Sequence, residues 1–339
     1  MAVPLWGWVA TIAAIGALVA VDIWQARRPH EVTFREALTW SLVYIGAAVL
    51  FGGTLALFVG GQPATAYFAG YLVEKSLSVD NLFVFAVILA QFAVPARHQQ
   101  RALLIGVIGA LGLRAVFIAA GAAVVQRFAV TFVVFGAFLL YTAIQLVRSH
   151  GQTPDVGDSR AVRLLRKVMP VTTDYSHDGL LTHVDGQRAA TPLLVVVVAI
   201  LSVDILFALD SIPAIFGITD SAYLVFTANA FALLGLRALY FLLVGLLDRL
   251  VHLHYGLAIV LAFIGVKLVL HYAHTVHAAV PEISTGISLL VVLIVITTTT
   301  LTSLRASAKT PEVADTTAGA AEADHPGAVV PRAKVRGPQ

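Results

Sequence analysis

The sequence lacks cysteine altogether among its 339 residues. Without thiols the chain forms neither disulfide bonds nor thiolate metal sites. Charged residues are also scarce, at 12% of the chain, whereas a typical soluble domain contains about 25%. The shortage of charge argues against an ordinary soluble domain and directs attention to the apolar residues.

Hydrophobic residues make up 59% of the chain, and the mean hydropathy is +0.88. A helix of roughly 20 apolar residues crosses a membrane core of about 30 Å. Nine stretches are apolar and near this length, and the third is broken by a polar cluster: 5–21, 38–59, 66–94, 102–125, 128–147, 192–209, 222–247, 255–270 and 286–301. The sequence therefore predicts an all-α, polytopic membrane protein of about nine transmembrane helices.

Basic residues gather on alternate loops of this nine-span arrangement. With the N-terminus outside, the loops and tail on the cytoplasmic side contain 17 of the 22 Lys and Arg residues, and the opposite loops contain only Arg127. Positive residues favour the cytoplasmic side, so the pattern predicts an external N-terminus and a cytoplasmic C-terminus. The net charge of +3 then reflects topology and does not indicate nucleic-acid binding. No basic segment precedes the first span, which favours a retained helix over a cleaved signal peptide.

Two motifs recur in the same order along the chain. "LSVDNLF" at 77–83 returns as "LSVDILF" at 201–207, and "LGLRA" at 111–115 returns unchanged at 234–238. Spans three to five thus correspond to spans six to eight, and an odd number of spans gives the two units opposite orientations. Such 3+3 inverted repeats are typical of secondary transporters, whose substrate site lies at the repeat interface near the bilayer midplane.

The chain divides into five regions by composition: 1–36 (first helix and loop), 37–147 (spans two to five), 148–190 (cytoplasmic loop), 191–304 (spans six to nine) and 305–339 (tail). Within the loop, "RAVRLLRKVMP" predicts a basic amphipathic helix at the membrane interface. "GLLTHVDGQRAATPL" predicts a hairpin that turns at Asp185-Gly186. A structured linker or a sensor domain would both fit this loop. The tail has the composition of a disordered segment.

Four acidic residues lie inside the predicted spans or directly at the end of one: Glu74, Asp80, Asp204 and Asp210. Each costs about 2.5–3.5 kcal/mol at mid-bilayer, so such residues are usually paired, protonated or bound to a cation. Asp80 and Asp204 are equivalent in the repeat, and we expect them to form the centre of one site. Neutral oxygens nearby come from Asn81, Ser211 and Ser78. Carboxylate, amide and hydroxyl oxygens suit Mg²⁺, Ca²⁺ or Mn²⁺.

Four basic residues balance these acids within the spans: Lys75, Arg114, Arg237 and Lys267. In one interpretation they form buried structural ion pairs with the acids. In the other they neutralise the acids while the site is empty, and an incoming cation displaces them. Protons competing for the same carboxylates would couple cation export to proton entry.

Four further polar residues allow two interpretations each. Asn229 lies on roughly the same helix face as Arg237 and serves either helix packing or the cation path. His271, His274 and His277 share one face near the outer end of the eighth span. They are either solvated at the interface or form a mouth that collects metal.

Three long motifs carry a resemblance to a known family. "YLVEKSLSVDNLFVF" (71–85), "FALDSIPAIFGIT" (207–219) and "NAFALLGLRALYFLL" (229–243) closely resemble the TerC family over roughly residues 30–305. The resemblance implies a protein of the bacterial cytoplasmic membrane that exports manganese, similar to LysE-type transporters. Glu74, Asp80 and Asn81 match the first acidic motif, Asp210 and Ser211 match the second, and Asp204 matches a common upstream aspartate.

The predicted substrate is therefore a divalent cation, chiefly Mn²⁺ with Ca²⁺ as a second candidate. We expect no resident cofactor, and we expect the protein to be surrounded by the lipid bilayer. The family is named for tellurium resistance, but tellurite is an anion that four acids are poorly suited to carry. An intramembrane aspartyl protease would need a Gly-x-Gly-Asp motif, which the sequence lacks, so we expect no enzyme. A membrane-protein assembly or stress-response factor without transport activity is the alternative function.

Overall fold

The computed structural model describes residues 3–26, 32–128, 130–148, 160–172, 175, 179–184, 187–244, 253–277, 280–281 and 283–309. A few side chains inside helices, that of Asp80 among them, lie outside the described part. Residues 310–339, most of the predicted tail, are outside it as well.

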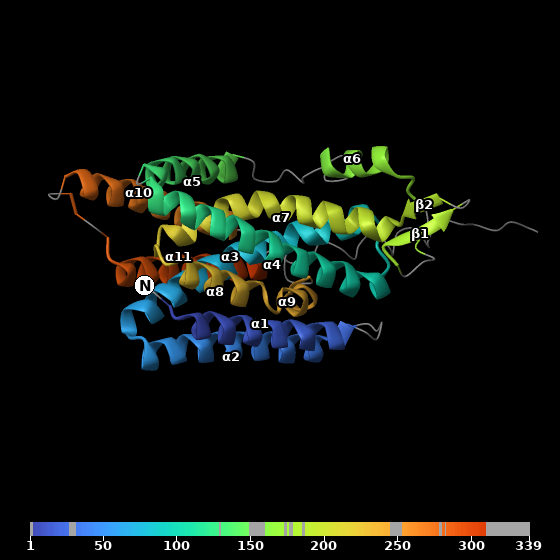
Figure 1. The fold of residues 1–339 in the computed structure, drawn as a ribbon, viewed down its shortest axis with the longest axis horizontal. Coiled ribbons are helices and arrows are strands. Elements are labelled where there is room, and N and C mark those ends of the chain that lie inside the picture. Colours follow the sequence, from blue (N-terminus) through green and yellow to red (C-terminus); the bar gives the residue numbers. More distant parts are fainter. Residues whose placement is uncertain are drawn as a thin grey trace, which may run out of the picture.

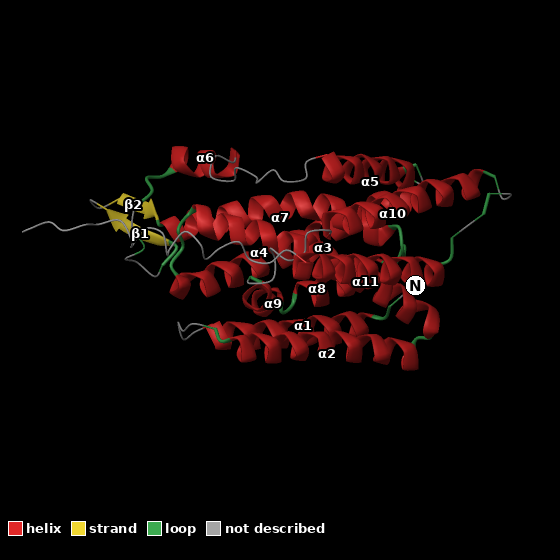
Figure 2. Ribbon diagram, turned by 180° about the vertical axis from the view of Figure 1, so that it is seen from behind, coloured by secondary structure: helices red, strands yellow, loops and turns green. Residues whose placement is uncertain are grey.

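Long helices running along one axis make up most of the described chain (Figure 1). Successive helices reverse direction, so their connections alternate between the two ends of the molecule, as the view from behind also shows (Figure 2). The membrane-length helices are α1 (Leu5–Ala26), α2 (Phe34–Phe58), α3 (Gly61–Gln91), α4 (Ala96–Arg127), α5 (Thr131–Arg148), α7 (Pro192–Phe216), α10 (Leu253–Val276) and α11 (Thr285–Lys309). The short helices are α6 (Arg160–Val168), α8 (Ala222–Leu233) and α9 (Leu236–Leu243).

Eight segments of the described chain are long and apolar enough to cross a membrane. They are 5–26, 34–58, 96–125, 131–148, 192–216, 222–242, 255–276 and 285–303. The prediction of an all-α, polytopic membrane protein is thereby confirmed. Helix α3 is 31 residues long but carries Glu74, Lys75 and Asp80, and it is not among the eight. The ninth span and the inverted repeat stay predictions.

Two predicted spans differ from the helices that form. The first span was expected to end at residue 21, but α1 continues to Ala26 and so includes Asp22. The seventh was expected as one helix over 222–247, but it breaks between α8 and α9 at Leu234 and Gly235. At the chain's C-terminal side, α11 extends to Lys309, a few residues past the predicted start of the tail.

Gly235 explains the break between α8 and α9. Its φ of +77° lies in the left-handed region, which residues with a Cβ enter only at a steric cost. A Cβ at this position would also come within 2.7 Å of the Tyr44 ring on α2. The identical "LGLRA" at 111–115 lies inside the continuous helix α4. Packing against α2 therefore decides the conformation of the second copy.

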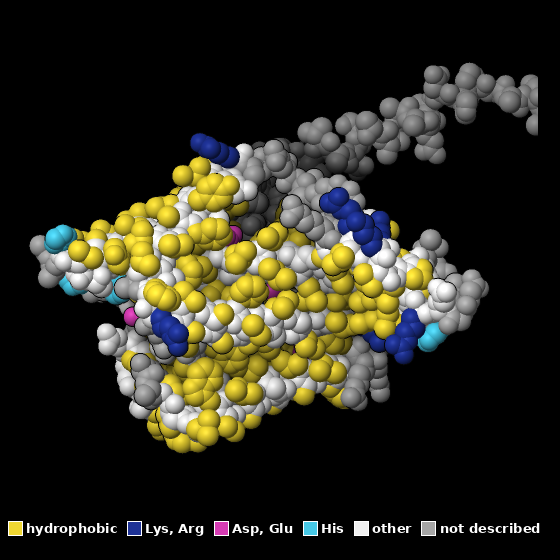
Figure 3. Space-filling model, turned by 45° about the horizontal axis from the view of Figure 1, so that its top comes forward, with side chains coloured by type: hydrophobic (Ala, Val, Ile, Leu, Met, Phe, Trp, Pro, Cys, Tyr) yellow, Lys and Arg dark blue, Asp and Glu magenta, His cyan; other side chains and the backbone are white. Residues whose placement is uncertain are grey.

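Helices α3, α4, α7 and α8 form the centre, where α7 and α8 each pack against both α3 and α4. Helices α1 and α2 form an outer layer on one side, and α5 with α10 lies on the other (Figure 1). Apolar side chains cover most of the face shown in Figure 3. Several large ones on α1 and α2 are strongly exposed, including Leu57 and Phe58, at 82% and 84%. Such a surface is suited to lipid, because a soluble protein rarely exposes so extensive an apolar surface.

The predicted hairpin and amphipathic helix both form in the loop that follows α5. Strands β1 (Leu181–Val184) and β2 (Gln187–Ala190) pair antiparallel, with Leu181 opposite Ala190. The expected turn at 185–186 lies outside the described residues. Thr191 then caps α7 by accepting a hydrogen bond from the Leu194 N–H (3.4 Å). Strand β2 and helix α6 both contact α7.

Candidate cation site

Arg114 lies in the middle of α4, and its side chain is fully buried among α3, α4 and α7. Its guanidinium forms an ion pair with Glu74 on α3. It also donates two hydrogen bonds to Asp204 on α7, from Nη2 to Oδ1 at 2.8 Å and from Nε to Oδ2 at 3.2 Å. We call these three residues, together with Ser211, the Arg114 cluster.

Ser211 completes the cluster from two turns further along α7. Its hydroxyl oxygen accepts a hydrogen bond from Nη1 of Arg114 at 3.3 Å. All four side chains are at most 1% exposed. The two-pronged contact with Asp204 uses the planar fork by which arginine recognises carboxylates. The structure therefore brings together Glu74, Asp204 and Ser211, which the sequence had suggested as metal ligands, around one of the predicted basic partners.

Several buried polar atoms of α3 and α8 have no hydrogen-bond partner within the described protein. They are Oε2 of Glu74, Oγ of Ser78 and both amide atoms of Asn229. Ser78 lies one helical turn after Glu74 on α3, and α8, which carries Asn229, packs against α3. Buried polar groups are nearly always paired, so such atoms call for an explanation, and an ion that binds at another stage is one.

Lys75 makes a different contact from the one its charge suggested. Its ammonium donates a hydrogen bond of 3.1 Å to the carbonyl oxygen of Ala232. Ala232 lies in the last turn of α8, directly before the break at Gly235, where carbonyl groups lose their helical partners. Lys75 thus ties α3 to the broken helix, next to Glu74 in the chain.

Asn81 and Asp210 line a separate cavity of about 400 Å³ between α3, α5, α7 and α10. The other polar groups in its wall are Tyr141, Thr142 and Gln145 of α5. We call it the Asp210 cavity. Asp210 is only partly buried, whereas Ser211, its neighbour in the chain, is in the Arg114 cluster. Asp204 and Asp210 are the two acidic residues of the predicted second half-site. Asp204 lies in the Arg114 cluster and Asp210 lines the cavity, so the two face different surroundings.

The side chain of Asp80, the expected partner of Asp204, lies outside the described residues, although its backbone is part of α3. Within the described part of the chain, no three His, Asp or Glu side chains gather as a metal-binding group. The pairing of Asp80 with Asp204 stays a prediction.

Arg237 on α9 has a partner that the sequence did not reveal. Its Nη2 and Nε both donate to Oδ1 of Asp22 on α1, at 2.7 Å and 3.0 Å. Gln100 on α4 and Gln25 on α1 accept further hydrogen bonds from the same guanidinium, at 3.2 Å and 3.3 Å. Asp22 went unnoticed because the first span was expected to stop one residue before it. A buried arginine without a nearby acid was the available signal.

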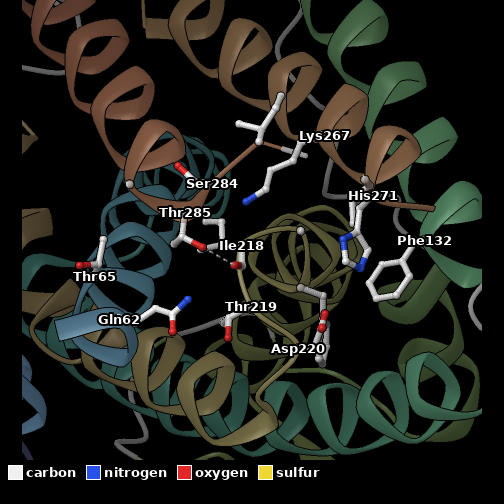
Figure 4. A pocket seen from close by; sticks show the side chains of 15 residues that line it. Gln62, Thr65, Phe132, Ile218, Thr219, Asp220, Lys267, His271, Ser284 and Thr285 are labelled. Carbon is white, nitrogen blue, oxygen red and sulfur yellow. Dashed lines mark hydrogen bonds between the residues drawn. The ribbon is translucent and has the colours of Figure 1, made fainter. Parts of the chain in front are cut away.

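A second cavity of about 630 Å³ opens at the end of the molecule where α1 begins. We call it the N-end cavity. Lys267 and His271 of α10 line it together with residues of α3, the α7–α8 turn and the start of α11 (Figure 4). His271 packs edge-on against Phe132, with ring centroids 4.9 Å apart.

The two other histidines of the predicted mouth differ from His271. His274 is hydrogen-bonded through Nδ1 to the carbonyl of Val280 at 2.6 Å. His277 is exposed at the end of the helix. Only His271 of the three lines the cavity.

Comparison with known proteins adds the family context. Residues 59–310 match the family described as "Integral membrane protein TerC family". An uncharacterized membrane protein of Mycobacterium tuberculosis, Rv2723, is 47% identical over 79% of this chain and 68% of its own length. The Myxococcus xanthus protein STKORF319 is 41% identical over 77% and 82%. Escherichia coli Alx, named "Putative membrane-bound redox modulator Alx", is 40% identical over 78% and 85%. No solved structure matches the chain.

Proposed function

From the premise that this chain belongs to the TerC family of integral membrane proteins, we propose that it is a secondary transporter that exports divalent metal cations from the cytoplasm. Mn²⁺ is its principal substrate, and the Arg114 cluster is its central site. The chain lies in the bacterial cytoplasmic membrane with its N-terminus outside and its C-terminus in the cytoplasm, and its repeats are inverted.

The observation that carries the proposal is the bridge that Arg114 makes between Glu74 and Asp204. These acids come from α3 and α7, and neither is exposed. Two carboxylates held together in a membrane interior are costly, so they are found where a function requires them. A permanent structural pair would be satisfied by one acid and one base. Here two acids share one guanidinium.

Charge favours a divalent ion at this position. Glu74 and Asp204 carry two negative charges when ionised, and Arg114 offsets one of them. A divalent cation would offset both. The ion would gain four carboxylate oxygens and the Ser211 hydroxyl, with the unpartnered Oε2 of Glu74 already available. Such a purely oxygen-based set suits hard cations such as Mn²⁺, Mg²⁺ and Ca²⁺.

Transport then requires an exchange of partners. The guanidinium holds the two carboxylates together while the site is empty, and the cation takes its place. Asn81 and Asp210 offer an amide and a carboxylate in the neighbouring Asp210 cavity as a stage before or after the central site. Protons that compete for these carboxylates would couple export to proton entry.

The broken helix α8–α9 provides a device for this exchange. Discontinuous helices are common at the substrate sites of secondary transporters, because their free carbonyls bind ions or basic groups. Lys75 occupies the carbonyl of Ala232 at the break and is adjacent in the chain to Glu74. A shift of α8 would release the ammonium and change the charge beside Glu74.

The name of Escherichia coli Alx mentions redox modulation, and any redox effect of this chain would be indirect. The chain has no cysteine, so it carries no thiol couple of its own. Control of the amount of a redox-active metal such as manganese is a route to such an effect that the residues here support.

Transport by the purified protein is the decisive test. Vesicles containing the wild-type chain should accumulate or release Mn²⁺, whereas vesicles with Asp204→Asn or Glu74→Gln should lose at least 90% of that flux. Glu36→Gln, which alters an acid in the first turn of α2, is the matched control and should transport normally. Mn²⁺ flux into or out of vesicles that contain only the wild-type protein would show that the protein itself transports, which an assembly factor would not do.

Cells provide the complementary measurement. A deletion strain should hold more manganese and grow poorly at high manganese, and the wild-type gene should restore both properties where Asp204→Asn does not. Unchanged manganese together with altered calcium or magnesium would refute the substrate. Full rescue by Asp204→Asn would refute the site.

A further inference from the structure

The N-end cavity is large, polar and has no role in the central site. Its walls come from α3, α5, α10, the α7–α8 turn and the start of α11 (Figure 4). The ammonium end of Lys267 points into the cavity, and Gln62 and Thr219 face it from the other side (Figure 4). Oxygen-bearing side chains dominate the remaining polar wall: Thr65, Asp220, Ser284 and Thr285. A hydrated ion would find hydrogen-bond partners on several sides.

The wall of this cavity includes the C-terminal end of the helix that carries the central acids. Phe216, Gly217 and Ile218 at the end of α7 line the cavity. Ser211 lies only five residues before Phe216 on the same helix, a rise of about 7.5 Å. The Arg114 cluster and the cavity therefore lie close together along α7.

An apolar layer occupies this short interval. It consists of buried residues from α4, α7 and α8 that belong to one apolar cluster: Ile118, Ala122, Ile212, Ile215, Phe216 and Val225. None is more than 6% exposed. Ile118 lies one turn after Arg114 on α4, and Ile215 lies one turn after Ser211 on α7, so both continue the faces that hold the cluster. Phe216 packs so near α4 that a Cβ on Gly121 would lie 3.1 Å from its ring.

From this arrangement we infer that the N-end cavity is the exit vestibule for a hydrated divalent cation and that the apolar layer is the gate between it and the Arg114 cluster. The inference rests on the proposed export function. It assigns the cavity and the layer to the path on the external side of the site.

Apolar constrictions close ion paths because water does not remain in them and a divalent ion does not cross without its water. A closed layer of Ile, Val and Phe also explains how the Arg114 cluster stays shielded from a polar cavity a few ångströms away. Small displacements of α7 against α4 and α8 would part the layer. Hydroxyl, amide and carboxylate oxygens of the cavity would then hydrogen-bond to the water molecules around the ion or replace them.

The absence of cysteine from the chain makes a direct test possible. Single cysteines are introduced into the full-length protein at Thr219, which lines the cavity, and at Ser211, behind the layer. Cells expressing each variant are treated from outside with a membrane-impermeant thiol reagent. Thr219→Cys should react readily, and Ser211→Cys should react at least about tenfold more slowly, a ratio equivalent to about 1.4 kcal/mol.

Truncation of the layer should then expose the deeper position. Ile215→Ala combined with Ser211→Cys should raise the labelling rate toward that of Thr219→Cys. Ile200→Ala is the matched control, because Ile200 is also a fully buried isoleucine of α7 but belongs to a different cluster. It should leave the rate unchanged. Val225→Ala, from the facing helix α8, replaces Ile215→Ala if that variant fails to fold.

Three results would overturn the inference: no labelling of Thr219→Cys from outside, equal labelling of Ser211→Cys and Thr219→Cys in the otherwise unaltered chain, or equal effects of Ile215→Ala and Ile200→Ala. Labelling needs no transported ion, so it is independent of the flux assay. The expected labelling pattern without Mn²⁺ flux would retain the apolar layer as a barrier between cavity and cluster but refute the proposed function. Mn²⁺ flux without the expected labelling pattern would refute the gate alone.

Discussion

Arg114 and Asp204 meet through two parallel hydrogen bonds of 2.8 Å and 3.2 Å, made between helices α4 and α7 where neither side chain is exposed. Only arginine offers this planar pair of donors, since a lysine ammonium acts as a point charge. The contact fixes both the charge and the orientation of Asp204. It also leaves the guanidinium in the place that we propose for the cation.

Removal of Arg114 should convert the cluster into a stronger metal site. Arg114→Ala leaves Glu74 and Asp204 without their shared partner, and the loss of one member of a buried pair typically costs about 3–5 kcal/mol. We expect a lower melting temperature without metal and a larger increase on addition of Mn²⁺ than in the wild type.

The matched control for this experiment is Arg127→Ala, at the exposed end of the same helix. It should melt like the wild type with and without Mn²⁺. An equal response of Arg114→Ala and the wild type to Mn²⁺, measured by thermal unfolding in detergent, would contradict a metal site at the cluster.

Substitutions of Asp22 and Arg237 should have coupled effects on the free energy of unfolding. Asp22→Asn leaves the buried guanidinium of Arg237 with only neutral amide acceptors and no acid, so we expect a lower melting temperature than for the wild type. In the double variant Asp22→Asn, Arg237→Gln, no buried charge remains unpaired. Its destabilisation should fall short of the sum of the two single effects by about 0.5–3 kcal/mol. Additive losses would show that the pair contributes nothing beyond its separate side chains.

These two arginines also show how far the sequence could predict the site. Charge inside apolar spans is rare enough to single out Arg114, Glu74 and Asp204 as candidate site residues, and the structure joins all three. The repeat also suggested that Arg237 is equivalent to Arg114. Both are buried and paired, but Arg237 binds Asp22, which lies in a helix outside the repeat. Contacts between distant helices depend on packing, which local motifs do not encode.

The helix break shows the same limit for the fold. Hydropathy located the eight apolar spans, because burial in lipid is determined by composition over some 20 residues. It did not separate α8 from α9, since "LGLRA" is helical at 111–115 and broken at 234–238. The contact between Gly235 and Tyr44 of α2 distinguishes the two copies. Likewise, residues adjacent in sequence, Asp210 and Ser211, enter different surroundings because a helix directs them about 100° apart.

Gly235→Ala tests whether this break needs glycine. The left-handed conformation costs an alanine about 1–2 kcal/mol, and the Cβ would collide with the Tyr44 ring at 2.7 Å. Both effects should lower the melting temperature and slow export, because α8 and α9 would be forced to rearrange. Gly53→Ala in α2 is the control, since a Cβ there meets nothing within 4 Å. It should be neutral or stabilising by up to about 1 kcal/mol. A melting temperature for Gly235→Ala equal to that of Gly53→Ala would show that the break tolerates a side chain.

Gly136 and Gly265 allow α5 and α10 to approach each other at backbone distance. A Cβ on Gly136 would lie 2.8 Å from the carbonyl oxygen of Gly265, and a Cβ on Gly265 would lie 2.9 Å from that of Gly136. Small residues commonly permit such contacts between membrane helices, where van der Waals packing drives association. Gly136→Ala must therefore push the two helices apart, and we expect a lower melting temperature.

The same variant should also alter transport, because α5 contributes Tyr141, Thr142 and Gln145 to the Asp210 cavity. Moving α5 away from α10 shifts these polar groups relative to Asp210, so Mn²⁺ flux should fall even at temperatures where the protein remains folded. Gly112→Ala, in α4 with no atom within 4 Å of the added Cβ, should preserve both properties. Lost stability with undiminished flux would confirm the packing contact but show that the Asp210 cavity lies off the cation path, leaving the Arg114 cluster as the whole site.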